Sequence, residues 1–220
     1  MAIKSDSRAC DEPSSLGKRP SKLTAEDPRK LVRSELDCLI RPLLQSDEAV
    51  LWEMLYHAIY VPDGAAPPER EVVYHPQLAG YARDWGRADD SGFLAENAAS
   101  REPLGAAWIR LLTGDSKGFG YVDDVTPELS VAVLQEYMGR GIGTRLLAKL
   151  LEAASPDYEA VSLSVDADNP ALRLYERLGF QTVGTTGTSL TMKKTLGTQV
   201  EESGLGVDPG REGVEKARRT

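Results

Sequence analysis

The strongest constraint on the fold is a strand, a glycine-rich turn and a helix in direct succession. Residues 128–133, Glu-Leu-Ser-Val-Ala-Val, are predicted to form the strand, and Gly139, Gly141 and Gly143 lie in the turn that follows. Apolar residues then recur at helical spacing, at Ile142, Leu146, Leu147, Leu150, Leu151 and Ala154. This succession points several backbone N–H groups at one spot, where the helix begins.

The start of this predicted helix has the properties of an anion site. The first N–H groups of a helix have no partner within it, and the helix N-terminus carries partial positive charge. The three glycines let the backbone approach a bulky anion without interference from Cβ atoms. We therefore predict a phosphate or pyrophosphate site, with ordinary turn and capping glycines as the alternative.

Two nucleotide-binding motifs are disfavoured by the same residues. No Gly-Lys-Ser/Thr follows the turn, so it is not a Walker A loop. The dinucleotide pattern G-x-G-x-x-G is only partly present, because Leu146 stands where the third glycine would be. The helix also leads to no acidic residue placed for a ribose.

A second block follows after the helix. Residues 161–165 alternate apolar and polar side chains and are predicted to form a strand. Asn169 is the expected N-cap of a short helix over residues 171–178, with Pro170 at its first position. A further strand is expected from residue 180.

The two blocks together resemble the GNAT family of acyl-CoA-dependent N-acetyltransferases. The first follows that family's pyrophosphate loop, Gln/Arg-x-x-Gly-x-Gly/Ala, and the second follows Asn-x-x-Ala-x-x-x-Tyr-x-x-x-Gly-Phe. The matching residues of the second block are Asn169, Pro170, Ala171, Leu174, Tyr175, Gly179 and Phe180. One position departs from the pattern: Met138 stands where the family has Gln or Arg. We therefore expect cofactor binding that is weakened rather than lost.

The resemblance implies an α/β protein of GNAT fold, with a mixed central sheet of six to seven strands flanked by about four helices. It covers residues 34–196, between polar tails at 1–33 and 197–220 that are predicted to be disordered. Besides the two blocks, strands are expected at residues 36–43, 91–96, 103–112 and 189–194, with a short extended piece at 119–122. Helices are expected from Asp47, as N-cap, to Ala58 and from Gln77 to Trp85.

The resemblance also implies acetyl-CoA as co-substrate and assigns its contacts. In the family the fourth and fifth strands splay apart to receive the pantetheine arm, so backbone groups of Val131 and Val133 are expected to bond it. The pyrophosphate is expected at Met138, Gly139, Arg140, Gly141, Ile142, Gly143 and Thr144. Asn169 is expected to be a helix cap, a cofactor contact or both.

Acyl transfer to an amine needs a neutral amine, donors for the developing oxyanion and an acid for the departing thiolate. Tyr175 occupies the position of the family's general acid and would also contact the cofactor; its alternative is a packed tyrosine with a locally bonded hydroxyl. Glu128 is the expected base, and its alternative is a strand-edge acid in solvent. Asp123 and Asp124 are the next candidates, with a solvated turn as their alternative.

The histidines and tryptophans suggest no further site. His57 is expected to be packed or at the surface of its helix. His75 has no Cys or His at metal-ligand spacing, so no metal is predicted. Trp85 and Trp108 are expected in the core or in a pocket wall, and Trp85 could instead line an acceptor pocket.

The net charge and the cysteines limit the expected partners and cellular compartment of the protein. The net charge is −8, which disfavours nucleic acid as a partner and is compatible with a cationic amine. No apolar run is long enough for a membrane helix, and Cys10 and Cys38 are not placed to form a structural disulfide, so a cytoplasmic protein is expected. The predicted function is direct acetyl transfer to a small-molecule or peptide primary amine in a ternary complex, with a homodimer left open. The alternative is a non-catalytic acyl-CoA-binding or sensor module.

Overall fold

The computed structural model describes residues 37–197. The predicted tails, 1–33 and all but the first residue of 197–220, therefore lie outside the described residues. One seven-stranded sheet has the strand order β1-β2-β3-β4-β5-β7-β6. The strands are β1 Cys38–Pro42, β2 Ser91–Asn97, β3 Pro103–Arg110, β4 Glu128–Val133, β5 Ala160–Asp166, β6 Gln181–Thr186 and β7 Ser189–Thr195. The α-helices are α1 Glu48–Ala58, α2 Pro76–Ala79, α3 Ile142–Ala154 and α4 Leu172–Arg177.

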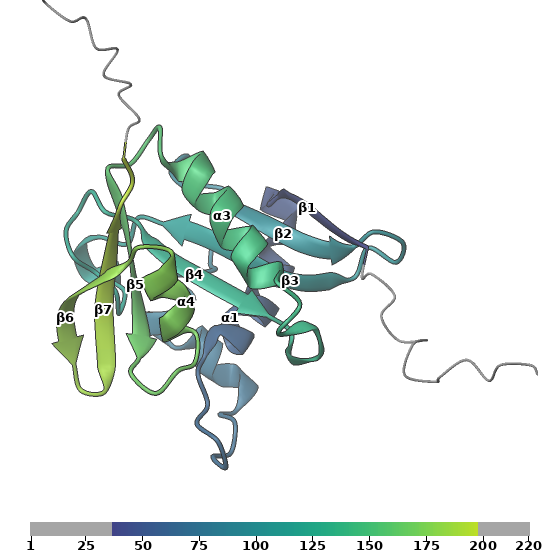
Figure 1. Cartoon of the computed structure of the whole chain (residues 1–220), viewed down its shortest axis with the longest axis horizontal. Helices are drawn as coiled ribbons and strands as arrows, with labels where there is room; N and C mark the ends of the chain where they lie inside the picture. Colours follow the sequence, from purple (N-terminus) through teal and green to yellow (C-terminus); the bar gives the residue numbers. More distant parts are fainter. Residues whose placement is uncertain (1–36, 198–220) are drawn as a thin grey trace, which may run out of the picture. The chain divides into compact units, whose positions relative to one another are not determined.

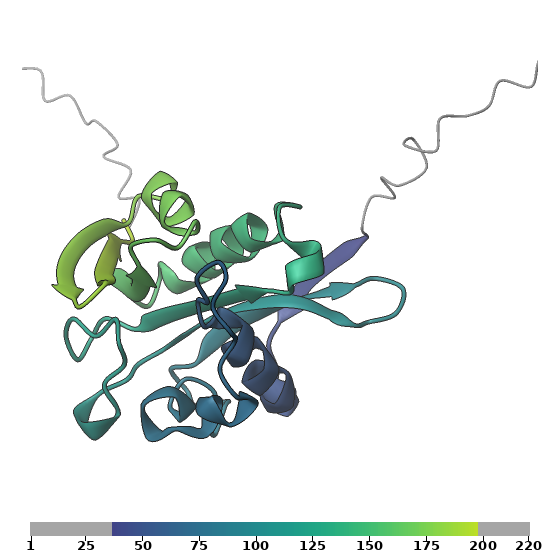
Figure 2. The same cartoon turned by 90° about the horizontal axis from the view of Figure 1, so that it is seen from below.

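The sheet is mixed and is covered on both faces. Neighbouring strands are antiparallel except for β4 and β5, which are parallel. Helices α3 and α4 lie on one face, whereas α1 and α2 lie on the other (Figures 1 and 2). Seven strands with four α-helices in this arrangement confirm the predicted fold class.

Both layers are held by apolar burial. The residues of α3 that were expected to face the core, Ile142, Leu146, Leu147, Leu150, Leu151 and Ala154, are all buried. On the opposite face, Leu51, Met54 and Leu55 of α1 pack in a core with Trp85 and Trp108. Each fully buried leucine stabilises the fold by about 1.5–3 kcal/mol relative to an exposed one.

The second predicted helix, from Gln77 to Trp85, is wrong in length. The α-helix ends at Ala79, and the chain continues in turns to Asp84. Arg110 of β3 binds the carbonyl oxygens of Gly80, Arg83 and Asp84, at 2.6–3.2 Å. A side chain from a distant strand thus satisfies three carbonyl groups of the turns that follow Ala79.

Three smaller expectations are also corrected. Asp47 does not cap α1 with its side chain, because its carboxylate binds Arg41 and accepts the Leu44 N–H. The extended piece at 119–122 is a loop and turn. Helix α4 begins at Leu172 rather than at Pro170, since the Leu172 N–H bonds the Asn169 carbonyl in a tighter turn of i to i−3 type.

Candidate cofactor and catalytic site

Strands β4 and β5 open away from each other. They share one backbone pairing, Glu128 with Ser162, where the Ser162 N–H donates to the Pro127 carbonyl at 3.0 Å. By contrast, β3 and β4 are paired from Arg110–Glu128 to Gly105–Val133. The ladder between β4 and β5 therefore ends near the start of β4, and the two strands diverge towards their C-terminal ends (Figure 1).

The register of β3 and β4 shows which backbone groups face this opening. The Leu134 N–H donates to the Leu104 carbonyl at 2.9 Å. In an antiparallel pair, hydrogen-bonded and non-hydrogen-bonded positions alternate. Counting back from Leu134, Val133 and Val131 occupy the positions that do not bond β3. Their N–H and C=O groups therefore point towards β5, into the opening.

The glycine-rich turn lies where β4 leads into α3. Gly139 and Gly141 have φ values of 72° and 78°, in the left-handed region that glycine adopts without strain. A Cβ atom at either position would have no other atom within 4 Å, so the space in front of the turn is open. Gly141 is the N-cap of α3, and Ile142, Gly143 and Thr144 supply the first N–H groups of the helix.

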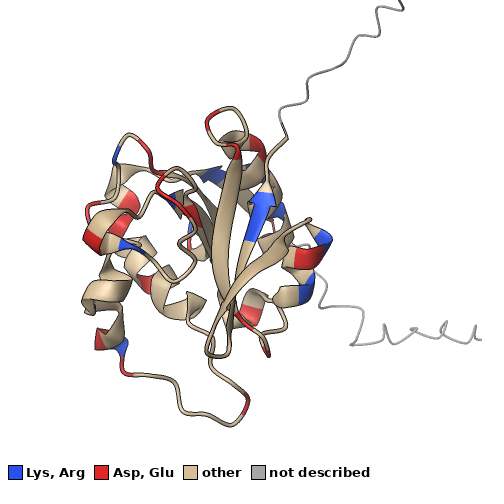
Figure 3. Cartoon of the chain, turned by 90° about the vertical axis from the view of Figure 1, so that its left-hand side faces the viewer, with Lys and Arg blue, Asp and Glu red and all other residues tan. Residues whose placement is uncertain are grey.

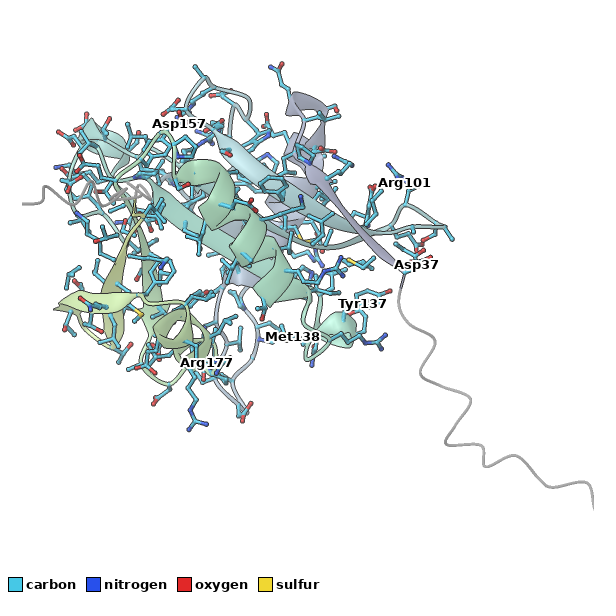
Figure 4. All side chains as sticks on the ribbon, turned by 45° about the horizontal axis from the view of Figure 1, so that its top comes forward. Asp37, Arg101, Tyr137, Met138, Asp157 and Arg177 are labelled. Carbon is cyan, nitrogen blue, oxygen red and sulfur yellow. The ribbon has the colours of Figure 1, made fainter. Side chains whose placement is uncertain are left out.

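The side chains of this turn are exposed rather than packed. Met138 and Tyr137 lie beside the N-terminal end of α3 (Figure 4). Met138 is 58% exposed. The guanidinium of Arg140 lies 5.6 Å from the centre of the Tyr137 ring. Because position 138 is methionine, Arg140 is the cationic side chain of this turn.

Tyr175 is held in α4 by packing. Its ring meets that of Phe180 edge-on, with 5.8 Å between ring centres, and only 8% of the residue is exposed. Burial alone raises the pKa of the Tyr175 hydroxyl to about 12, with no contribution from a hydrogen bond. The hydroxyl therefore keeps its proton at neutral pH and is free to donate it.

Glu128 is a buried acid, so its interpretation as a strand-edge acid in solvent is wrong. It is 4% exposed. Its Oε1 accepts the Gly120 N–H at 2.7 Å and the Tyr81 hydroxyl, whereas Oε2 has no partner among the described residues. Burial raises the pKa of Glu128 to about 7, against the opposing effect of these two donors.

Comparison with known proteins agrees with this geometry. The model of the acetyltransferase (GNAT) family matches residues 52–180, more than half of the chain. The chain belongs to the GNAT family. An L-2,4-diaminobutyric acid acetyltransferase from Nocardia farcinica is 33% identical over 109 residues, which are 44% of this chain and 56% of that protein. A mycothiol acetyltransferase from Saccharomonospora viridis is 36% identical over 105 residues, 44% of this chain and 31% of that protein.

These matches cover about half, or less, of the length of the two curated relatives. Among solved structures, the PaiA N-acetyltransferase from Thermoplasma acidophilum, in complex with coenzyme A, superposes with a TM-score of 0.51 at 19% identity. That match covers 72% of this chain and 98% of the other. It supports the GNAT fold.

The other polar residues predicted for the site, Asp123, Asp124 and Asn169, form hydrogen bonds or ion pairs within the protein. Asp123 accepts the Val125 N–H at 3.1 Å and lies 3.3 Å from the ammonium of Lys193, and its pKa is lowered chiefly by the Thr126 hydroxyl. Asp124 accepts the Tyr121 hydroxyl at 2.8 Å. Asn169 Oδ1 accepts the Ala171 N–H at 2.9 Å, but Asn169 is not the predicted N-cap, because α4 begins at Leu172 and its N-cap is Ala171.

The two histidines form hydrogen bonds with neighbouring residues, and Trp85 and Trp108 lie in the core. His57 Nε2 lies 3.0 Å from Glu53 Oε1, and His75 Nδ1 accepts the Gln77 N–H at 3.4 Å. Trp85 is 3% exposed in the core, under the guanidinium of Arg110 at 5.3 Å from its ring centre, so it does not line an open pocket. Trp108 is buried too.

The described part of the chain holds neither a metal cluster nor a membrane-spanning helix. Within residues 37–197 there is no group of three or more His, Cys, Asp and Glu side chains arranged to hold a metal ion. None of the helices in that range combines the length and the apolar character needed to cross a membrane. Charged residues on the β6–β7 side lie mostly on helices and loops (Figure 3).

One groove of the described residues lies away from Glu128. Its volume is about 470 Å³, and it is lined by Ala49, Val50, Glu53, Met54, His57, Pro103, Leu134 and Glu136. These residues surround the C-terminal end of β4, whereas Glu128 is the first residue of that strand. The groove and the buried acid therefore belong to different ends of the same strand.

The residues that surround Glu128 come from segments distant in the sequence and were not among the predicted site residues. Tyr81 was placed within a predicted helix, with no sign that its hydroxyl would reach an acid 47 residues away. Gly118 and Gly120 left a weak signal, because two glycines around one residue often mark a close backbone approach. A Cβ atom at Gly118 would collide with Glu128 Oε2 and with the Tyr81 hydroxyl.

Proposed function

We propose that the chain is an N-acetyltransferase that moves an acetyl group from acetyl-CoA to a primary amine by direct attack in a ternary complex. The observation that carries this proposal is the opening between β4 and β5, where the backbone groups of Val131 and Val133 lead to the glycine-rich start of α3. Membership of the GNAT family and the names of the relatives support it.

The residues around the opening fit acetyl-CoA. A Cβ atom at Gly143 would lie 3.5 Å from Val133 Cγ2, so the Val133 side chain is on the α3 face, as are the alternate side chains of β4. Val131 and Val133 thus give that face an apolar wall, suited to a pantetheine arm. The open turn and the free N–H groups of α3 suit a pyrophosphate.

The other face of the opening is polar. Glu128 and Ser162 are register partners and therefore share a face, which Ser130 and Ser164 also share because side chains alternate along a strand. This is the face covered by α1 and α2. A polar wall with one carboxylate suits a hydrophilic, cationic amine, and we propose that the acceptor enters from this side as a small molecule or a peptide N-terminus.

The proposed chemistry assigns one role to each group. Acetyl-CoA, when bound, supplies an activated acetyl group. Glu128 takes one proton from the acceptor ammonium, and the N–H of Val131 or Val133 is proposed to hold the acetyl carbonyl oxygen. As the C–N bond forms and the C–S bond breaks, Tyr175 gives its proton to the departing sulfur. The second amine proton then restores Tyr175, and Glu128 releases its proton to solvent before the next turnover, so protons balance.

Release of CoA in the presence of amines tests this function. The panel should contain diamines, amino acids, polyamines and peptide N-termini. We expect at least one amine to raise CoA release well above the rate of acetyl-CoA hydrolysis, with an N-acetylated product of the expected mass. Tight CoA binding without turnover of any amine would favour the alternative, a non-catalytic acyl-CoA-binding module, which the departure at Met138 makes worth testing.

A matched pair of substitutions at Gly143 tests the proposed phosphate site. Gly143 lies inside α3, and an added Cβ would make only an ordinary contact with Val133, so alanine fits without strain. We expect Gly143→Ala to keep CoA affinity within a few-fold and Gly143→Val to lose at least about tenfold, because the branched side chain crowds the helix N–H groups. Calorimetry measures both affinities, and melting curves check the fold. Equal affinities in the two variants would place the phosphates elsewhere.

Substitution of Met138 by arginine is expected to raise the affinity for CoA. Arginine at this exposed position restores the family's cation beside the proposed pyrophosphate. We expect Met138→Arg to tighten CoA binding by about threefold to tenfold at low salt, with the gain reduced at high salt by screening. Met138→Ala, as control, should leave affinity nearly unchanged. An Arg variant that binds no better than wild type would mean that this side chain does not reach the anion.

A further inference from the structure

Glu128 is held asymmetrically. Its Oε1 atom accepts two hydrogen bonds, from the Gly120 N–H at 2.7 Å and from the Tyr81 hydroxyl. The same hydroxyl accepts the Phe119 N–H at 2.7 Å, which orients its proton towards Glu128. Oε2 is buried and has no hydrogen-bond partner among the described residues. The two oxygens of this carboxyl group are therefore not equivalent.

The position of Tyr81 is fixed by side chains of β3. Trp108 Nε1 donates to the Tyr81 carbonyl at 2.9 Å, and Arg110 Nη1 donates to the neighbouring Gly80 carbonyl at 2.9 Å. Arg110 is itself paired with Asp90, and both side chains are almost fully buried. The backbone that carries Tyr81 is thus bonded to two buried side chains of β3.

The loop that follows β3 packs against Glu128 and Tyr81. Gly118 and Gly120 bring the backbone directly against the carboxyl group, since a Cβ atom at Gly120 would come within 2.9 Å of Glu128 Oε1. The same Cβ would come within 2.5 Å of the backbone of Leu163 in β5. Glycine at these positions lets the backbone lie directly against the carboxyl group of Glu128.

We propose that Tyr81 is a positioning residue for Glu128: it fixes Oε1 and leaves Oε2 as the oxygen that exchanges the proton of the acceptor amine. This inference rests on the proposed function, in which Glu128 is the base. Tyr81 acts through Glu128 and need not touch either substrate.

The physical role of Tyr81 is to keep the base ionised in a buried setting. A donor to a carboxylate favours its charged form, which opposes the effect of burial on the pKa of Glu128. Burial and the nearby carboxylate raise the pKa of Tyr81, so its hydroxyl stays protonated and remains a donor. Of the other groups beside Glu128 in the sheet, Arg110 is turned to Asp90 and Ser162 carries no charge.

The first test compares pH–rate profiles of wild type and Tyr81→Phe with an amine that the enzyme accepts. Loss of the donor raises the pKa of Glu128, so the acidic limb of kcat/KM should move upward by about one pH unit. The value of kcat/KM should fall about tenfold near pH 6.5 and recover at pH 9. Tyr158→Phe is the control, because it removes a tyrosine hydroxyl that bonds only the Asp89 carbonyl. A loss that is equal at every pH would overturn the proposal.

A second measurement does not depend on activity. Carbon-13 NMR of labelled glutamate carboxyl groups, with the signal assigned by Glu128→Gln, gives the titration of Glu128 directly. We expect a higher pKa in Tyr81→Phe than in wild type, and the same value in both would overturn the proposal. If Tyr81→Phe fails to fold, 3-fluorotyrosine introduced at position 81, a stronger donor of similar shape, should move the pKa downward. Failure of every amine to react would reject the proposed function while this titration still decides the role of Tyr81.

Discussion

Replacement of Tyr175 by phenylalanine is expected to lower kcat by roughly 10²–10⁴-fold, the range that general acid catalysis typically contributes. Affinity for acetyl-CoA should change little, because the hydroxyl is proposed to act on the departing sulfur. The phenylalanine ring keeps the packing against Phe180, so stability should be close to that of wild type. Rates of CoA release give kcat, and calorimetry gives the affinity.

The pH dependence sharpens this test. The pKa of Tyr175 is about 12, so wild-type turnover should show no loss from ionisation of this hydroxyl below about pH 10. A Tyr175→Phe variant with unchanged kcat would return Tyr175 to a packing role. Unchanged affinity with a lower kcat would support the role of general acid.

Replacement of Glu128 by glutamine is expected to lower kcat/KM by roughly 10²–10⁴-fold above neutral pH. With a folded-state pKa of about 7, Glu128 is protonated below neutral pH and cannot accept a proton there. Wild-type activity should therefore fall as the pH drops through 7, and this limb should vanish in Glu128→Gln. The gap between the two proteins should narrow again near the pKa of the amine, where the acceptor is already neutral. If the pH–rate profiles of wild type and Glu128→Gln coincide, another residue is the base, and Asp123 would be tested next.

Although Glu128→Gln should lower activity, it should raise the free energy of unfolding at alkaline pH. The pKa of Glu128 is raised on folding from 4.5 to about 7, so the folded state favours the protonated form. Its contribution to stability is present below pH 4.5 and is lost as the pH rises through 7. Glu128→Gln should therefore gain up to about 3 kcal/mol in unfolding free energy relative to wild type at pH 8, and much less at pH 4. Denaturant melts at both pH values measure this difference.

The elements that could be predicted are those set by local pattern. The strand at 128–133 and the helix at 142–154 have the predicted bounds, because alternation, glycines and helical spacing occur within one short stretch. The directions of the Val131 and Val133 backbone groups agree with the expectation too, since they depend on the register with β3. The assignment of these groups to cofactor contacts stays a prediction.

The surroundings of Glu128 could not be predicted because distant segments build them. Tyr81 reaches Glu128 across 47 residues, and the turns that carry it are bonded through their carbonyl groups to Arg110 of β3. Gly118 and Gly120 indicate only a close backbone approach, and the sequence does not identify Glu128 as the residue approached. A charged residue at the first position of a strand is ordinarily expected in solvent.

The most direct test of the central claim is a nitrogen-15 NMR titration of the intact protein with acetyl-CoA. If acetyl-CoA binds between β4 and β5, the amide signals of Val131, Val133, Gly143 and Thr144 should shift together with one saturating affinity. In Gly143→Val, the shifts of Val131, Val133 and Thr144 should need at least about tenfold more acetyl-CoA to saturate. A titration to millimolar acetyl-CoA that leaves these four amides unmoved, or that shifts only amides elsewhere in the protein, would contradict the account.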